Sequence, residues 1–328
     1  MMSSVEQAPL GTPYTAATTS EEVMAGVDLT YKVAVVTGGY SGLGLHTTTA
    51  LTRAGAHVIV PARRVDTARA ALDGITGVQV VEMDLADQDS IRAAAAEIAQ
   101  SVDRIDLLFA TAGIMATPLE RTTQGWESQF AVNHLGHFAL TMHLWPLLAT
   151  ADSARVVLYS SAGHHLSPIR WSDIDFTGGY DKWQAYGQSK TAMILFGRGL
   201  TALGAADGIE AFSLHPGAIL TPLQRHLPLQ EQIDLEWVDE DGNGIDTSFK
   251  SVVQGAATGL WAATSTDLTG RGGVYCEDCD IAPTAIPGGS MADGGVQPYA
   301  IDPDEAERLW EESLRRTGIG REWSIAMP

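Results

Sequence analysis

The feature that most constrains the fold is an alternation of short β-branched runs with longer stretches of helical character. The runs are "KVAVVTG", "AHVIVPA", "GVQVVEMDL", "RIDLLFATAG", "SARVVLYSSAG" and "GIEAFSLHPG". They lack polar alternation, so both faces of each strand should be buried. Strand–helix–strand repetition favours parallel pairing through right-handed crossovers. The sequence therefore predicts an α/β fold, a doubly wound and mostly parallel sheet with helices on both faces. Ligands of such sheets bind at the carboxyl ends of the strands.

The ends of the chain differ in character from this alternating part. Residues 1–18 are expected to be a flexible segment, and residues 19–328 a single domain of this α/β type. The stretch "DPDEAERLWEESLRRTG" starts with Asp and stops at Gly, and it carries an apolar stripe. It predicts a C-terminal helix over about residues 302–317, which closes the domain or contributes to an oligomer contact.

Charge and hydropathy exclude several classes of partner. The formal net charge of −20 should repel nucleic-acid backbones and anionic lipids. No run approaches the length of a membrane span, and the first residues lack the basic and apolar regions of a signal peptide. With only two cysteines, the chain suits a reducing compartment. We expect a cytoplasmic protein without a nucleic-acid partner or a membrane span.

Those cysteines, Cys276 and Cys279, form a C-x-x-C pair in "VYCEDCD". Such a pair can be half of a zinc site or a redox couple. Zinc would need two more soft ligands, and there is no second cysteine pair. The neighbouring acidic residues should raise the thiol pKa values, which disfavours a reactive thiolate. We expect two reduced, structural cysteines and no metal site.

A glycine-rich segment, "TGGYSGLG", follows the first predicted strand and opens a helix. Glycine lets the backbone approach a pyrophosphate closely, and the amides at the helix start then face that anion. A plain glycine turn is the alternative, but the strand–turn–helix context favours dinucleotide binding. The residues predicted to contact the cofactor here are Gly38, Tyr40, Ser41, Gly42, Leu43 and Gly44.

The end of the second strand bears on the choice of cofactor. An NAD enzyme usually has an acidic residue near here for the ribose hydroxyl, whereas this chain has Ala62, Arg63 and Arg64. A guanidinium suits a 2′-phosphate. NADP(H) is therefore favoured and NAD(H) remains possible, the alternative being two merely solvated arginines. Asp84 and Leu85 end the third strand, where adenine could rest, although Asp84 could equally cap a turn.

Tyr186 and Lys190 lie four residues apart in "QAYGQSKTAMILF" and so share one helix face. A nearby cation is expected to lower the phenol pKa and make the tyrosine an effective acid/base. A packing pair on a helix surface is the alternative. Ser161 ends another strand and could hold a substrate oxygen beside Tyr186.

Together, "TGGYSGLG", Ser161, "YGQSK" and "HPGAILT" resemble the short-chain dehydrogenase/reductase family, in order and spacing, from about residue 32 to 221. The resemblance implies a Rossmann-type fold with Ser161 orienting a carbonyl, Tyr186 as general acid/base and Lys190 on the nicotinamide ribose. It also implies that Asn133 anchors a proton-relay water. The remaining cofactor contacts it implies are Pro216, Gly217, Ile219 and Thr221, with Ala112 and Gly113 in "ATAG", where the family has "NNAG".

The long insertion after Ser161 and the segment "GGVYCEDC" are similar to the retinol-dehydrogenase-like subgroup. This implies apolar aldehyde, ketone or alcohol substrates, a substrate lid over about residues 218–250 and a possible homodimer or homotetramer. His164 and His165 could touch substrate or cap backbone. Four alternatives stay open: a redox sensor without turnover, a scaffold protein, an NAD-dependent alcohol dehydrogenase and a reductase of carbon–carbon double bonds.

Overall fold

The computed structural model describes residues 6–320. Its centre is an eight-stranded sheet in the order β3-β2-β1-β4-β5-β6-β7-β8, in which every pairing is parallel except that of β7 with β8. The order reverses between β1 and β4, so the prediction of a doubly wound, mostly parallel sheet is confirmed. The strands are β1 Val33–Val36, β2 His57–Ala62, β3 Val78–Glu82, β4 Leu107–Ala110, β5 Ala154–Tyr159, β6 Ile209–Leu214, β7 Tyr275–Glu277 and β8 Asp280–Ile281.

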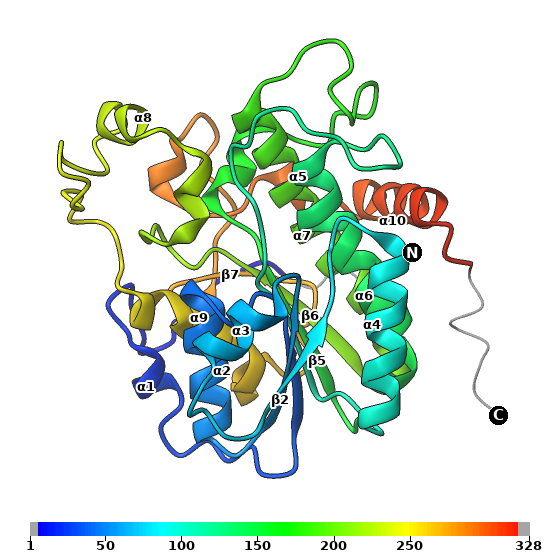
Figure 1. Ribbon diagram of the computed structural model, residues 1–328. Helices are drawn as coiled ribbons and strands as arrows, with labels where there is room; N and C mark the ends of the chain where they lie inside the picture. Colours follow the sequence, from blue (N-terminus) through cyan, green and yellow to red (C-terminus); the bar gives the residue numbers. More distant parts are fainter. Residues whose placement is uncertain (1–5, 321–328) are drawn as a thin grey trace.

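Helices cover both faces of the sheet (Figure 1). On one face lie α1 Ser20–Val23, α2 Gly42–Arg53, α3 Val65–Ala71 and α9 Val252–Thr264; on the other lie α4 Gln88–Ser101, α6 Gly136–Ala149, α7 Lys182–Gly204 and α10 Pro303–Thr317. Each face has its own apolar core cluster. Strands β4 and β5 are buried along their whole length, as continuous apolar runs require.

The long helix expected around "ESQFAVNHLGHF" is interrupted. A short α5, Ser128–Phe130, passes into a π-helical turn, Ala131–Leu135, before α6 begins. Single π-helical turns inside helices often occur at functional sites. This one contains Asn133 and sets the direction in which its side chain leaves the helix.

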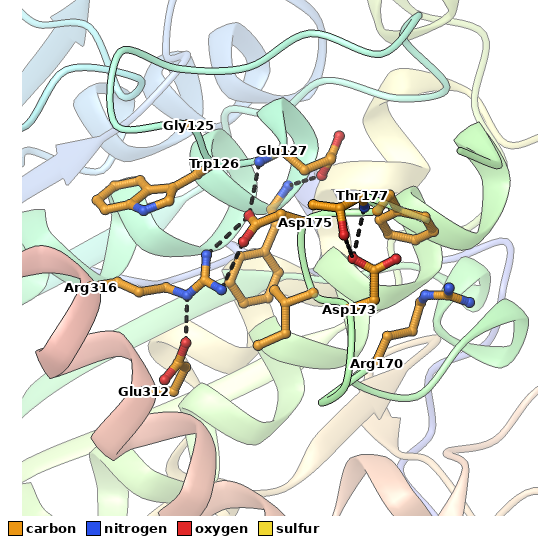
Figure 2. Close-up of polar contacts among 12 residues, drawn as sticks. Gly125, Trp126, Glu127, Arg170, Asp173, Asp175, Thr177, Glu312 and Arg316 are labelled. Atoms are coloured by element: carbon orange, nitrogen blue, oxygen red, sulfur yellow. Dashed lines mark hydrogen bonds and ion pairs between the residues drawn. The ribbon is translucent and has the colours of Figure 1, made fainter. Parts of the chain in front are cut away.

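The C-terminal helix α10 is fixed to the insertion after β5 by an ion-pair network (Figure 2). The Arg316 guanidinium donates two hydrogen bonds to the Asp175 carboxylate, at 3.0 and 2.9 Å, and a third to Glu312 at 2.6 Å. Asp175 also accepts a hydrogen bond from the backbone N–H of Glu127. Glu127 caps α5, so the network connects α10, the insertion and the helix that leads to Asn133.

Residues near the start of the described chain lie against the β7–β8 edge. The Gln7 side chain donates hydrogen bonds of 2.7 Å to the carbonyl oxygens of Tyr275 and Ala282. The Asp280 carboxylate accepts from the backbone N–H groups of residues 10–12. Residues 7 and 10–12, which make these contacts, belong to the segment 1–18 that was expected to be flexible.

Candidate active site

The glycine-rich turn between β1 and α2 leaves no room for larger residues. A Cβ on Gly44 would overlap the carbonyl oxygen of Gly38, and a Cβ on Gly38 would lie 3.1 Å from Cα of Ala112. Gly38 and Gly42 both have positive φ, +66° and +50°, which favours glycine. Ser41 makes no side-chain cap hydrogen bond to the start of α2. The first amides of α2 therefore suit an external anion, and these residues fit a dinucleotide pyrophosphate.

The other predicted cofactor residues lie in this turn or follow β2 and β6. Tyr40 is partly buried and packs against the core cluster on the α2 face of the sheet. The side chains of Leu43 and Ile219 both lie against Gly255 of α9, where a Cβ would come within 2.8 Å of each. Arg63 and Arg64 follow β2, with Arg64 at the N-cap of α3.

Asp84 and Leu85 both take part in packing after β3. The Asp84 carboxylate accepts a hydrogen bond of 2.9 Å from the backbone N–H of Ala86 and lies 3.9 Å from Nη1 of Arg63. Asp84 thus makes the turn contact that the sequence left open. Leu85 packs closely against Gly136 at the start of α6. A Cβ on Gly136 would overlap the Leu85 carbonyl oxygen.

Ser161 and Tyr186 come together beside Gly163. A Cβ on Gly163 would lie 2.8 Å from Cε1 of Tyr186 and 3.3 Å from Oγ of Ser161. Ser161 follows β5, and its hydroxyl accepts a hydrogen bond from the backbone N–H of Gly163. Tyr186 lies in the first turns of α7 and is 4% exposed. A hydroxyl and a phenol thus meet at the carboxyl end of the central sheet.

Lys190 lies one turn after Tyr186 on α7 and is buried with it. Its ammonium donates a hydrogen bond of 2.9 Å to the carbonyl oxygen of Tyr159. A Cβ on Gly113 would lie 3.7 Å from this ammonium and 3.2 Å from Oδ1 of Asn133. Burial lowers the pKa of Lys190 to about 8.

The expected direction of the Tyr186 pKa shift is wrong for this arrangement. Burial raises the pKa of Tyr186 to about 12, and the Ser161 hydroxyl only partly opposes that effect. Removing the phenolate from water is the largest cause of this shift. The tyrosine is therefore held protonated near neutral pH.

Asn133 joins the π-helical turn to the segment after β4. Its amide accepts a hydrogen bond from the backbone N–H of Ile114 and donates to the Ile114 carbonyl oxygen, both at 2.9 Å. It also donates to the Ser189 hydroxyl on α7. Asn133 therefore has a fixed orientation next to Lys190.

The "ATAG" departure from the family pattern is balanced by a threonine. The Thr37 hydroxyl, at the end of β1, accepts hydrogen bonds from the backbone N–H groups of Thr111 and Ala112, at 3.0 and 3.1 Å. It also contacts Nε2 of His137 at 2.9 Å. These bonds connect β1 to the turn after β4, where the two family asparagines are missing.

The segment after β6 runs to the glycine-rich turn. Pro216 is half-buried, and Gly217 has φ +95° and packs on the stem of Lys250. Thr221 caps the short helix η4, Pro222–His226. A Cβ on Gly42 would lie 3.5 Å from Cβ of Thr221, so this segment closes over the turn.

Tyr186 is surrounded by an apolar wall. Met115, Ala116 and Leu227 are buried against its ring, and Leu223, Trp183 and Trp237 pack around them. The rings of Trp183 and Trp237 meet edge to face at 6.3 Å. Lys182 pairs with Glu231 of α8, Leu229–Asp234, at 2.5 Å. Met115 was missed, although its place two residues after "ATAG" is a usable signal.

The histidines and cysteines near the site make structural contacts. His164 bonds the Ser161 carbonyl oxygen and the Gln297 backbone N–H, and His165 bonds the Gly295 carbonyl oxygen. Both cysteines are free and buried, and burial raises the pKa of Cys279 to about 11. Within residues 6–320, no group of three or more His, Cys, Asp or Glu side chains is placed to hold a metal ion.

Comparison with known proteins identifies the family. The family model described as short chain dehydrogenase matches residues 32–232. The chain belongs to the short-chain dehydrogenase family. Short-chain dehydrogenases of this kind are NAD(P)-dependent oxidoreductases that interconvert alcohol and carbonyl groups, and the protein is one of these enzymes.

Individual relatives cover most of the chain. A probable oxidoreductase of Streptomyces lividans is 43% identical over 293 residues, which are 87% of this chain and 97% of that protein. Retinol dehydrogenase 12 of Mus musculus is 35% identical over 299 residues, 89% of this chain and 88% of that one. The crystal structure of an uncharacterized Mycobacterium Paratuberculosis protein matches with a TM-score of 0.68 and 31% identity, covering 94% of this chain and 98% of its own.

These relatives confirm the resemblance to the retinol-dehydrogenase-like subgroup. Among residues 6–320 of this short-chain dehydrogenase, no helix combines the length and apolar character needed to cross a membrane.

Proposed function

We propose that the protein transfers a hydride between NADP(H) and an apolar aldehyde, ketone or alcohol, with Tyr186 as general acid/base. The observation that carries the proposal is the meeting of Tyr186 and Ser161 at Gly163, with the buried ammonium of Lys190 5.5 Å from the centre of the Tyr186 ring. A redox sensor without turnover has no need for this combination.

The dinucleotide supplies or accepts the hydride when it is bound. During reduction the Tyr186 hydroxyl gives its proton to the carbonyl oxygen, and in oxidation it takes a proton back. The raised pKa of Tyr186, about 12, keeps that proton in place and supports the reductive direction. The Ser161 hydroxyl donates a hydrogen bond to the same oxygen. Lys190 would bind the nicotinamide ribose, and Asn133, held by Ile114 and Ser189, would anchor a proton-relay water beside it.

The predicted substrate class is supported by the walls around the phenol. Met115 and Leu227 are buried against Tyr186, and the indoles of Trp183 and Trp237 are close by. Sites lined in this way bind molecules with large apolar surfaces and few polar groups. The similarity to retinol dehydrogenase 12, whose name states an apolar alcohol, agrees with this class.

The test begins with fluorescence titrations of the purified protein with NADPH and NADH, followed by turnover assays on apolar aldehydes. Tyr186→Phe should lower turnover by about 10²- to 10⁴-fold while NADPH affinity changes by less than about twofold. Tyr31→Phe, at an 86% exposed tyrosine, is the matched control. Binding of neither dinucleotide overturns the proposal, as does full turnover by the Tyr186 variant. Equal binding of both cofactors removes the NADP(H) preference alone.

A further inference from the structure

Arg225 is an arginine of the lid that lies beside the predicted phosphate-binding residues. It belongs to η4, and its Nη1 donates a hydrogen bond of 2.9 Å to the Pro222 carbonyl oxygen. η4 starts at Thr221, the residue packed against Gly42 of the glycine-rich turn. The guanidinium therefore projects from an element that covers the cofactor cradle.

Two further guanidiniums act electrostatically on Arg225. Burial lowers the pKa of Arg225, and the charges of Arg63 and Arg64 lower it further, while Tyr40 raises it. The short helix η4 packs on the glycine-rich turn through Thr221 and Gly42, and this packing brings the lid arginine toward the end of β2. Like charges brought together repel one another unless a counter-ion is present.

The protein supplies almost no counter-charge here. Within the described residues neither Arg64 nor Arg225 forms an ion pair, and Nη1 of Arg63 is 3.9 Å from the half-exposed carboxylate of Asp84. The whole chain has 40 acidic and 20 basic residues, so a set of three arginines with a single carboxylate, at 3.9 Å from one of them, stands out. Guanidinium forks match phosphate oxygens in a bidentate manner.

We propose that Arg225 is a third ligand for the 2′-phosphate of NADP(H), presented by the lid opposite Arg63 and Arg64. This inference rests on the proposed function, which takes NADP(H) as the cofactor. The same contact has a second effect, because Leu227 lies two residues further along and packs against Tyr186. A bound 2′-phosphate therefore holds the lid over the catalytic tyrosine, so that the cofactor assembles the substrate pocket.

The first experiment compares dissociation constants for NADPH and NADH. Arg225→Ala should weaken NADPH binding about tenfold and leave NADH binding unchanged. Arg225→Lys keeps the charge but loses the forked pair of guanidinium donors. Its NADPH affinity should therefore lie between that of the wild type and that of Arg225→Ala. The control is Arg271→Ala, an exposed arginine in the turn before β7, at the opposite edge of the sheet.

The second experiment needs no nicotinamide and no turnover. Trypsin cleavage after Arg225 of the wild-type protein is followed by mass spectrometry with 2′,5′-ADP or 5′-ADP present, and cleavage after Arg271 is the internal reference. Protection at Arg225 by 2′,5′-ADP alone is expected. Equal protection by the two nucleotides would overturn the role of Arg225.

The outcomes separate this inference from the proposed function. If the wild type prefers NADPH and Arg63→Ala removes the preference while Arg225→Ala does not, the lid arginine has no part in binding and the proposed function stands. If the wild type binds neither dinucleotide, the proposed function itself fails. Selective loss of NADPH affinity in Arg225→Ala supports both.

Discussion

The ammonium nitrogen of Lys190 lies 5.5 Å from the centre of the Tyr186 ring, one turn further along α7. In residues 6–320 it has no carboxylate partner, and its hydrogen bond goes to the carbonyl oxygen of Tyr159. A buried ammonium without a counter-ion acts electrostatically on whatever titrates beside it. The phenol of Tyr186 is that neighbour.

Replacing Lys190 by Met should therefore move the pH dependence of alcohol oxidation. The phenol must lose its proton for oxidation, and the cation favours that loss only while Lys190, with a pKa of about 8, is itself charged. We expect kcat for oxidation at pH 7 to fall about tenfold in Lys190→Met, and the two profiles to converge above pH 8. Profiles of kcat against pH for wild type and Lys190→Met measure this. Profiles that coincide would show that the ammonium does not tune the tyrosine.

The glycine-rich turn gives a prediction about binding. In Gly44→Ala the new methyl group overlaps the Gly38 carbonyl oxygen, so the turn must open. We expect dinucleotide affinity to fall at least tenfold, equivalent to about 1.4 kcal/mol. Gly178→Ala is the control, because its Cβ would meet only the Asp173 carboxylate, at 3.4 Å. Unchanged NADPH binding in Gly44→Ala would argue against a pyrophosphate site at this turn.

Trp237 of the lid should set the preference for large substrates. It contacts the Trp183 ring beside Tyr186, so Trp237→Ala removes one side of the apolar wall. KM for a long-chain or aromatic aldehyde should rise about tenfold, with little change for propanal. Leu229→Ala, at a lid residue that is 47% exposed, should leave both values as they are. A uniform change with both aldehydes would point to a disturbed lid rather than to lost substrate contacts.

Two neighbouring arginines of α10 should differ in their effect on stability. The Arg316 side chain is 9% exposed and binds Asp175, whereas that of Arg315 is 68% exposed and binds Glu312. Removing one partner of a buried pair leaves an uncompensated charge, so Arg316→Ala should lower the free energy of unfolding by about 3 kcal/mol. Arg315→Ala should lower it by less than about 1 kcal/mol. Urea denaturation compares the variants, and equal losses would contradict the network in Figure 2.

Burial of His134 should make the folded state less stable at acid pH. It is fully buried, with Nε2 2.8 Å from the Ser313 hydroxyl, and burial lowers its pKa to about 3. The unfolded chain takes up this proton near pH 6.5, so between pH 6.5 and about 3 the unfolded state binds more protons. The contribution of the neutral His134 to the free energy of unfolding is therefore fully present above pH 6.5 and is lost as the pH falls toward 3. His134→Gln should reduce the slope of unfolding free energy against pH by about 1.4 kcal/mol per unit, and an unchanged slope would refute this.

Much of the fold could be predicted because its signals are local. Buried strands appear as continuous apolar runs, and the glycine-rich turn has a fixed place between a strand and a helix. The π-helical turn around Asn133 was not predicted, because no local pattern marks the change from α5 to α6. The pKa of Tyr186 was given the wrong direction, because its burial depends on lid and insertion residues distant in sequence.

In the candidate site, too, the local relationships could be predicted and the long-range ones could not. Tyr186 and Lys190 could be paired from their spacing, whereas the neighbours of Arg225 lie more than 150 residues earlier in the chain. Asp175 and Arg316 are separated by 141 positions. Contacts of this kind depend on how the elements pack, and a single sequence does not encode them in a readable spacing.

The contacts of Gln7 and Asp280 have a consequence for the order of folding. The Gln7 amide bonds carbonyl oxygens 268 and 275 positions later, and Asp280 receives amides from 268 to 270 positions earlier. During synthesis residues 7–12 lack these partners until the β7–β8 edge has emerged. Closing such a long loop is slow. The nascent chain must therefore carry these residues without their partners while all the strands from β1 to β6 are made.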